Sequence, residues 1–257
     1  MDRIKETFQA QSGKKVLIGY LTAGDPFIGD TVRLGTKMLA TGMDILELGV
    51  PYSDPLADGP VLQQAAIRAI QSGTTPGCVF NMVRKIRNET EKPIVLLVYY
   101  NTILTYGIEE FVRASRSAGV DGLVVPDLPM EHREPLRIEM KRKNEQETEF
   151  SLIPLVSKQS HCRIREILKD MTGFVYCVSY SGVTGGKAHF DQEVLSFLEE
   201  VRGESHLPIA VGFGIRNHED MLRLQGKVDG MIVGTAIMEK AKEGEDVLLR
   251  FIESELL

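Results

Sequence analysis

Short runs of apolar and β-branched residues recur along the chain at fairly even spacing. Most of these runs are continuous rather than alternating, which is typical of parallel strands that are covered on both faces. They predict eight buried strands. The runs are 16–22, 44–50, 93–100, 122–128, 150–156, 174–179, 208–214 and 230–236.

The segments between these runs have the period of an α-helix. In "VLQQAAIRAI" (61–70), "IEEFVRASRSAG" (108–119) and "QEVLSFLEEV" (192–201), the apolar residues fall on one helical face and most charged residues lie off it. A further amphipathic helix is predicted at about 2–10. The gap between the second and third runs is the widest, and it leaves room for a long loop and an additional helix.

Eight strand–helix units in 257 residues match the size of a (β/α)₈ barrel, the TIM barrel. A doubly wound open sheet is the main competitor, but it usually has fewer strands, and no GxGxxG motif follows the first run. No linker, low-complexity tract or change of composition divides the chain. The sequence therefore predicts an α/β protein with one TIM-barrel domain over residues 1–257 and an extra N-terminal helix.

Composition narrows the choice of partners. With 43% hydrophobic and 26% charged residues, the chain is typical of a globular protein, and its net charge of −6 argues against nucleic acid or an anionic membrane as the main partner. The three cysteines are too few and too scattered for a disulfide framework or a zinc site, which indicates a reducing compartment. The N-terminus has no apolar signal core, and no window reaches 18 apolar residues, so we expect a cytoplasmic protein.

One carboxylate lies inside a predicted strand. Glu47 is in the middle of "DILELGV" (44–50), where both faces of a barrel strand are buried. A lone carboxylate there costs several kcal/mol unless it is paired, hydrogen-bonded or at the mouth of the barrel. Glu47 is near the C-terminal end of the strand, where barrels hold their active sites, and burial would raise its pKa toward neutrality. A buried salt bridge to a neighbouring strand is the alternative.

Two more acids follow in the proline-rich loop "PYSDPLADGP" (51–60). Its three prolines stiffen the loop and forbid a helix through it, so its side chains are held in place. Asp54 and Asp58 are therefore candidates for chemistry at the mouth. The alternative is that they are turn or N-cap residues, and this alternative is stronger for Asp54.

Glycines follow the last three strands, in "SGVTGG" (181–186), "GFGI" (212–215) and "GTAI" (234–237). Glycine lets backbone N–H groups approach an anion closely, and a following helix adds its dipole. The loops after the seventh and eighth strands form the frequent phosphate site of this fold. Together with Gly185, these loops predict a small phosphorylated substrate.

Other polar and aromatic residues give weaker signals. The histidines show no metal-ligand spacing and are expected on the surface. They are His132, His161, His189, His206 and His218. Three tyrosines lie at or near strand ends, where they are either core aromatics or hydrogen-bonding groups at the mouth. They are Tyr99, Tyr100 and Tyr176.

Five segments resemble the signature segments of the tryptophan synthase alpha subunit family in order and spacing. They are "LELGVPYSDPLADGP", "GLVVPDLP", "SYSGVTGG", "VGFGI" and "IVGTAI". The resemblance begins at "IGYLTAGDP" (18–26) and covers nearly the whole chain. It implies a (β/α)₈ barrel that cleaves indole-3-glycerol phosphate to indole and glyceraldehyde 3-phosphate without a cofactor of its own. It also implies a beta subunit that contains pyridoxal phosphate (PLP), in an α₂β₂ heterotetramer with a tunnel for indole.

The resemblance also implies roles for individual residues. The family's catalytic glutamate and aspartate fall on Glu47 and Asp58. The substrate-binding positions fall on Tyr176, Thr184, Gly185, Phe213, Gly214, Gly234 and Thr235. The loops that hold Asp54 and residues 180–190 resemble segments that become ordered on substrate binding and signal to the beta subunit.

The chemistry of this reaction fits the two acids. Ring carbon 3 of indole must be protonated before the carbon–carbon bond breaks, which needs an acid that titrates near neutrality, as a sheltered Glu47 can. Positive charge then develops on the ring nitrogen, where an ionised Asp58 would stabilise it. Such opposite protonation states require surroundings that push the two pKa values apart.

Two positions depart from the usual family pattern. Thr235 stands where serine is common, and it keeps the hydroxyl while adding a methyl group near the phosphate. Tyr180 stands where arginine is common, in the loop that would close over the site.

Three other functions compete with this one. They are a catalytically weak subunit that mainly activates a beta partner, a different phosphate-binding barrel such as an isomerase or an indole-glycerol-phosphate-forming synthase, and a pure interaction module. The synthase would be expected to use a lysine as its general acid, and no run carries a lysine at its C-terminal end.

Overall fold

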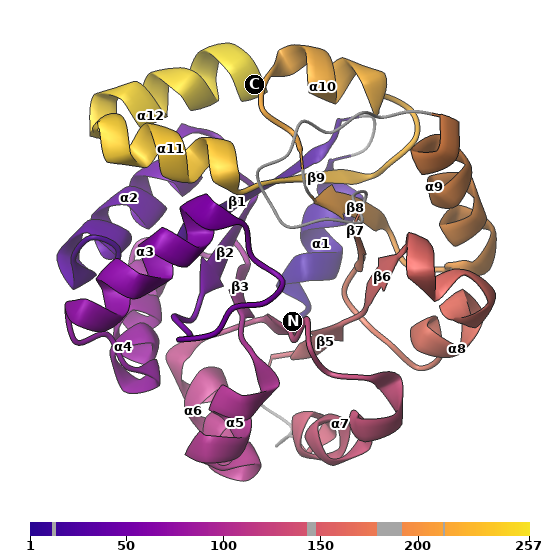
Figure 1. Ribbon diagram of the computed structural model, residues 1–257, viewed down its shortest axis with the longest axis horizontal. Coiled ribbons are helices and arrows are strands. Elements are labelled where there is room, and N and C mark those ends of the chain that lie inside the picture. The colour runs from indigo at the N-terminus through magenta and orange to yellow at the C-terminus, as the bar shows by residue number, and fades with distance from the viewer. Residues whose placement is uncertain (12–13, 143–147, 179–191, 213) are drawn as a thin grey trace.

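The computed structural model describes residues 1–11, 14–142, 148–178, 192–212 and 214–257. These residues contain nine parallel strands in one sheet, surrounded by helices (Figure 1). The strands are β1 (Val16–Thr22), β2 (Ile45–Gly49), β3 (Ile94–Leu97), β4 (Gly122–Val124), β5 (Ser151–Ile153), β6 (Leu155–Ser157), β7 (Val175–Val178), β8 (Ile209–Gly212) and β9 (Gly230–Val233). The helices are α1 (Arg3–Ala10), α2 (Ile28–Thr41), α3 (Pro60–Gln71), α4 (Pro76–Arg87), α5 (Tyr100–Tyr106), α6 (Ile108–Ala118), α7 (Glu134–Lys141), α8 (Ile164–Leu168), α9 (Gln192–Glu204), α10 (His218–Arg223), α11 (Thr235–Glu243) and α12 (Glu245–Phe251).

The sheet closes into a barrel through the strand that was predicted at 150–156. The strand order is β5-β4-β3-β2-β1-β9-β8-β7-β6, so the two strands at its ends are β5 and β6, which only Pro154 separates in sequence. Proline has no N–H group for a strand ladder. The carbonyl of Pro154 accepts a hydrogen bond from the Tyr176 N–H at 2.9 Å. The prediction of a (β/α)₈ barrel is confirmed, with the fifth of its eight strands broken in two.

Residues of each strand alternate between the barrel interior and the helical layer. On β2, Leu46 and Leu48 belong to the apolar cluster shared with the helices, whereas Ile45 belongs to a second cluster inside the barrel. Glu47 lies two residues after Ile45 and therefore points inward. The long connection between β2 and β3 contains the loop 50–59, α3 and α4, as the wide gap in the sequence predicted.

Helix α1 closes the N-terminal end of the barrel (Figure 1), which confirms the predicted extra helix. Its buried Ile4 belongs to the interior cluster, and the ring centroid of Phe8 lies 5.6 Å from that of Phe174. The side chain of Asp2 caps the helix by accepting a hydrogen bond from the Lys5 N–H at 3.0 Å. The helix fills the end of the barrel that lies away from the C-terminal edges of the strands.

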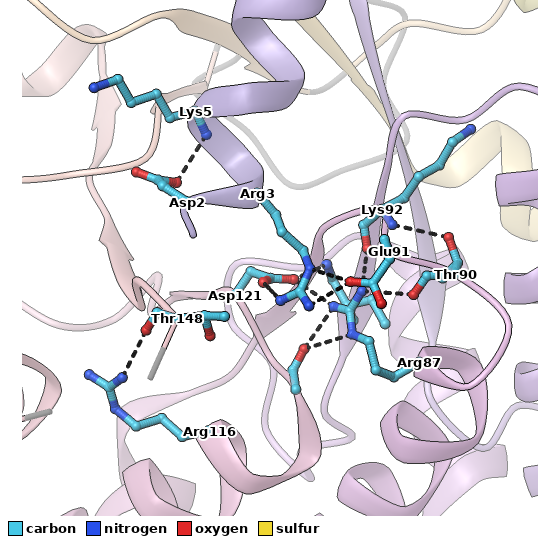
Figure 2. Close-up of polar contacts among 12 residues, drawn as sticks. Asp2, Arg3, Lys5, Arg87, Thr90, Glu91, Lys92, Arg116, Asp121 and Thr148 are labelled. Carbon is cyan, nitrogen blue, oxygen red and sulfur yellow. Dashed lines mark hydrogen bonds and ion pairs between the residues drawn. The ribbon is translucent and has the colours of Figure 1, made fainter. Parts of the chain in front are cut away.

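A buried carboxylate ties this helix to the sheet (Figure 2). Asp121, immediately before β4, accepts hydrogen bonds from Arg3 at 3.1 Å, from Arg87 at 2.6 Å and from the Ile94 N–H at 2.8 Å. Both oxygens of this buried acid are therefore used, as a buried charge requires. At this end of a barrel, polar networks usually contribute to stability rather than to catalysis.

The surface positions expected for the histidines are confirmed where the structure describes them. Among the histidines, His132, His161, His206 and His218 are exposed, as predicted, and His189 lies outside the described residues. No helix in the described ranges is long and apolar enough to cross a membrane.

Candidate active site

Glu47 lies on the inner face of β2, with Tyr20 of β1 and Val95 of β3 as its register neighbours. Its side chain is fully buried, and neither carboxyl oxygen has a hydrogen-bond partner among the residues that the structure describes. Burial, with a smaller contribution from the charge of Asp58, raises the pKa of Glu47 to about 8. The alternative of a buried salt bridge is not seen in the described part of the chain, and Glu47 is a protonated acid at neutral pH.

Asp58 lies at the end of the loop 50–59 and is also buried. Its N–H donates to the Pro55 carbonyl at 3.0 Å, and its own carbonyl accepts from the Gln63 side chain at 2.9 Å. Burial raises the pKa of the Asp58 carboxyl to about 6, against a lowering by the Tyr99 hydroxyl. The N-cap of α3 is Gly59, so Asp58 is not the N-cap residue, but its N–H closes a turn with Pro55, as the alternative of a turn residue held. Asp54 is exposed, and its carbonyl accepts a hydrogen bond from the Leu56 N–H in a tight turn, which agrees with the alternative that Asp54 is a turn residue.

Two buried tyrosines line the barrel interior beside Glu47. Tyr20 and Tyr176 both have raised pKa values, first because of burial and then because of the nearby carboxyl groups. Two glycines make room for their rings. A Cβ at Gly49 would lie 2.1 Å from the Tyr20 hydroxyl, and one at Gly212 would lie 2.7 Å from the Tyr176 ring.

The sequence pointed to Tyr176 but not to Tyr20. The available signal was the alternation in "VLIGYLT" (16–22), which places Tyr20 on the same strand face as Ile18 and toward the C-terminal end. Its hydroxyl lies 3.2 Å from that of Thr22. Tyr99, a weak candidate in the sequence, is buried and contacts Asp58.

The apolar cluster inside the barrel is not buried throughout. Three aliphatic side chains of the inner apolar cluster are only partly buried: Leu97 on β3, Leu155 on β6 and Val178 on β7. Leu97 and Val178 are the last residues of their strands, whereas Leu155 is the first residue of β6. The barrel interior that holds Glu47 is therefore lined by apolar side chains, some of them only partly buried.

The predicted phosphate contacts lie partly within the described residues. Gly234 is the N-cap of α11 and Thr235 is its first residue. Gly234 has φ −110°, and a Cβ there would meet Tyr20 only at 3.7 Å, so neither the backbone nor these neighbours require a glycine. Its missing side chain leaves space in front of a helix N-terminus, which favours an anion.

Gly214 has φ +87°, a conformation that itself favours glycine. The remaining predicted contacts, Thr184, Gly185 and Phe213, lie outside the described residues, as does Tyr180. Across the described ranges, no group of three or more His, Cys, Asp or Glu side chains is arranged to hold a metal ion.

Fold and site together define a (β/α)₈ barrel with two buried carboxyl groups at the C-terminal edge of its strands, where proteins of this class carry out their chemistry. The family model described as tryptophan synthase alpha chain matches residues 7–254. The chain belongs to the tryptophan synthase alpha chain family, as its sequence motifs indicated.

Individual relatives agree with this assignment. The chain is 43% identical to the tryptophan synthase alpha chain of Alkaliphilus metalliredigens, over 95% of this chain and 91% of that protein. It is 42% identical to the one from Caldanaerobacter subterraneus, over 95% and 92%.

Solved structures show the same similarity. A structure of Mycobacterium tuberculosis tryptophan synthase superposes with a TM-score of 0.90 at 30% identity, covering 98% of this chain and 96% of that one. The alpha subunit from Legionella pneumophila gives 0.87 at 32% identity, with coverage of 98% and 96%.

Proposed function

We propose that this protein is a lyase that cleaves indole-3-glycerol phosphate to indole and D-glyceraldehyde 3-phosphate. The observation that carries the proposal is the pair of buried carboxyl groups, Glu47 on β2 and Asp58 in the loop that follows it. Glu47 is protonated at neutral pH and has no partner among the described residues, whereas Asp58 is ionised above a pH of about 6. A family member with this pair intact is expected to catalyse the reaction.

Each acid has a distinct task in this mechanism. The protonated Glu47 donates its proton to ring carbon 3 of the indole group, and the ring nitrogen becomes positively charged. The Asp58 carboxylate accepts a hydrogen bond from the ring N–H and stabilises this charge, more strongly in a water-poor site than it would in water.

The cycle closes on the same glutamate. Once it has lost its proton, the Glu47 carboxylate removes the proton from the glycerol hydroxyl next to the ring. The carbon–carbon bond then breaks, its electron pair returns to the ring to restore neutral indole, and the aldehyde forms. Glu47 is again protonated, so the reaction consumes no external acid or base.

The phosphate of the substrate has a candidate site at the N-terminus of α11. Gly234 leaves space for it, and the first-turn N–H groups of the helix, with the Thr235 hydroxyl, would donate to its oxygens. We place Gly214, and by family resemblance Thr184, Gly185 and Phe213, around the same substrate, with Tyr176 beside Glu47.

We also propose a tryptophan synthase beta subunit as the partner, in an α₂β₂ heterotetramer. The relatives are named as alpha chains, which supports a second type of subunit. The PLP of the complex is expected in that beta subunit, and no step of the cleavage uses it.

The test is release of indole from indole-3-glycerol phosphate by the purified chain, with and without a beta subunit. Glu47→Gln and Asp58→Asn should each lower kcat by about 10²–10³-fold, the usual loss for an acid–base or charge-stabilising group. Glu89→Gln, a change of the same kind at an exposed position, should have no effect. Absence of turnover in the unaltered chain, even with the partner, would favour the alternative of a subunit that only binds ligand and activates its partner.

A further inference from the structure

Tyr99 lies between the end of β3 and the first turn of α5, directly across from the loop 50–59. Its side chain is 3% exposed, although neighbouring Tyr100 is only half-buried. Such burial needs a hydrogen-bond partner for the hydroxyl. Two groups of the loop supply it, which points to a role beyond filling the core.

The hydroxyl of Tyr99 bridges two consecutive residues of the loop. Its oxygen accepts a hydrogen bond from the Ala57 N–H at 3.0 Å, and the hydroxyl is near enough to the Asp58 carboxyl to lower its pKa. Since the oxygen accepts from the backbone, its proton is free to be donated to Asp58. One side chain thus fixes the backbone before Asp58 and lies next to its carboxyl group.

The ring of Tyr99 holds the other end of the same loop. It stacks on Tyr52 with a centroid distance of 5.0 Å and an interplanar angle of 21°. The Tyr52 hydroxyl in turn accepts from the Asn101 side chain at 3.4 Å. The loop is therefore held by Tyr99 near its beginning and near its end.

Tyr99 itself is held firmly by the barrel. The Val98 N–H donates to the Val124 carbonyl at 3.0 Å, and the Tyr100 N–H donates to the Asp127 carboxylate at 2.8 Å. The Tyr99 carbonyl accepts from the Thr102 N–H at 3.0 Å. A side chain that starts from such a fixed backbone can position the loop rather than follow it.

We propose that Tyr99 is a positioning residue for the cleavage reaction, which holds the loop 50–59 so that the Asp58 carboxylate points toward the substrate ring. This inference rests on the proposed function. It assigns Tyr99 no contact with the reacting atoms, because it acts through Asp58.

The physical consequence of losing the hydroxyl has a definite sign. The hydrogen bond from Tyr99 lowers the pKa of Asp58, so its removal raises that pKa above about 6. Asp58 must be ionised to stabilise the ring cation. The acid limb of the pH profile should therefore move to higher pH, which a purely structural change would not produce.

The experiment compares Tyr99→Phe with Tyr100→Phe, which removes the same atom from the adjacent residue. We expect kcat/KM at pH 7 to fall about tenfold in Tyr99→Phe, with its acid limb displaced to higher pH, and both quantities to be unchanged in Tyr100→Phe. The affinity for an uncleavable indole-alkyl phosphate, measured by calorimetry, should change by less than about threefold. In the Asp58→Asn background the Tyr99→Phe change should have little further effect on residual turnover, since coupled residues are not additive.

A second variant covers the case in which Tyr99→Phe does not fold. Tyr52→Leu removes the stacked ring and leaves the Tyr99 hydroxyl, and it should displace the acid limb in the same direction by a smaller amount. If the unaltered chain releases indole and Tyr99→Phe shows the same rate and the same pH profile, the positioning role is refuted. If Tyr99→Phe weakens binding of the analogue equally in the unaltered chain and in the Asp58→Asn background, Tyr99 contacts the substrate directly, and the positioning role is again refuted. Failure of the unaltered chain to release indole would instead overturn the proposed function.

Discussion

Replacing Glu47 by glutamine should stabilise the fold at neutral and alkaline pH, although it lowers kcat strongly. The ordinary pKa of this carboxyl is 4.5, and burial raises it to about 8. Between these two values the unfolded chain loses the proton and the folded chain keeps it. The free energy of unfolding therefore falls as the pH rises through this window.

The magnitude follows from the same two values. At about 1.4 kcal/mol for each pH unit, the free energy of unfolding of the unaltered protein is lower by ~3 kcal/mol at pH 7 and by ~5 kcal/mol at pH 8 and above than in acid. Glutamine has nearly the same shape and does not titrate. At pH 5 the variant should match the unaltered protein to within about 1 kcal/mol, and at pH 8.5 it should be more stable by several kcal/mol.

Thermal unfolding of both proteins at pH 5, 7 and 8.5 measures this difference. For a chain of this size, each 1 kcal/mol corresponds to a shift in Tm of about 2–4 °C. Other titrating groups are common to both proteins, so they largely cancel when the comparison is made at one pH. A gap in Tm that stays constant across the three values, or a less stable variant at pH 8.5, would refute the buried, partnerless state of Glu47 on which the mechanism depends.

Three further predictions concern other parts of the molecule. The profile of kcat/KM against pH should be bell-shaped, rising near pH 6 as Asp58 ionises and falling near pH 8 as Glu47 loses its proton, and a flat profile from pH 5 to 9 would contradict these roles. Gly234→Asp should raise KM for the phosphorylated substrate at least about tenfold by charge repulsion, and it should not destabilise α11, because aspartate is a good N-cap. Gly203→Asp on the open face of α9 is the control, and an unchanged KM in Gly234→Asp would place the phosphate elsewhere. Asp121→Asn should lower the free energy of unfolding in urea by about 3 kcal/mol, since it leaves Arg3 and Arg87 without their buried counter-charge. Glu91→Gln, at the exposed partner of Arg3, should change it little, and an unchanged stability of Asp121→Asn would show that the network contributes little.

The strands were well predicted by the sequence because their signal is local. Continuous apolar runs separated by helical periods need only neighbouring residues to be recognised, and all eight predicted runs contain observed strands. The break at Pro154 was not foreseen. A proline within an apolar run shows that the ladder is interrupted there, but only the pairing of β5 with β4 and of β6 with β7 shows that the interruption closes the barrel.

The candidate site was also predicted only in part. Glu47 and Asp58 stood out because acids inside an apolar strand and in a proline-rich loop are unusual for a chain that must bury them. Tyr20 and Tyr99 did not, because aromatic residues in strands are common and most of them only fill the core. Their importance comes from what they contact, and the contact of Tyr99 with Asp58 joins residues that are far apart in the chain.

By itself, then, the sequence determined the architecture, the family and the two acids proposed for the reaction, since composition, periodicity and motif spacing all lie along the chain. Tertiary structure alone decided that Glu47 has no partner among the described residues and that Tyr99 bonds to the loop beside Asp58. It also decided that Asp121 bonds to Arg3 across 118 positions of sequence. The reason is physical: the register of parallel strands sets which side chains meet inside a barrel, and burial at those meeting points sets which of them keep a proton.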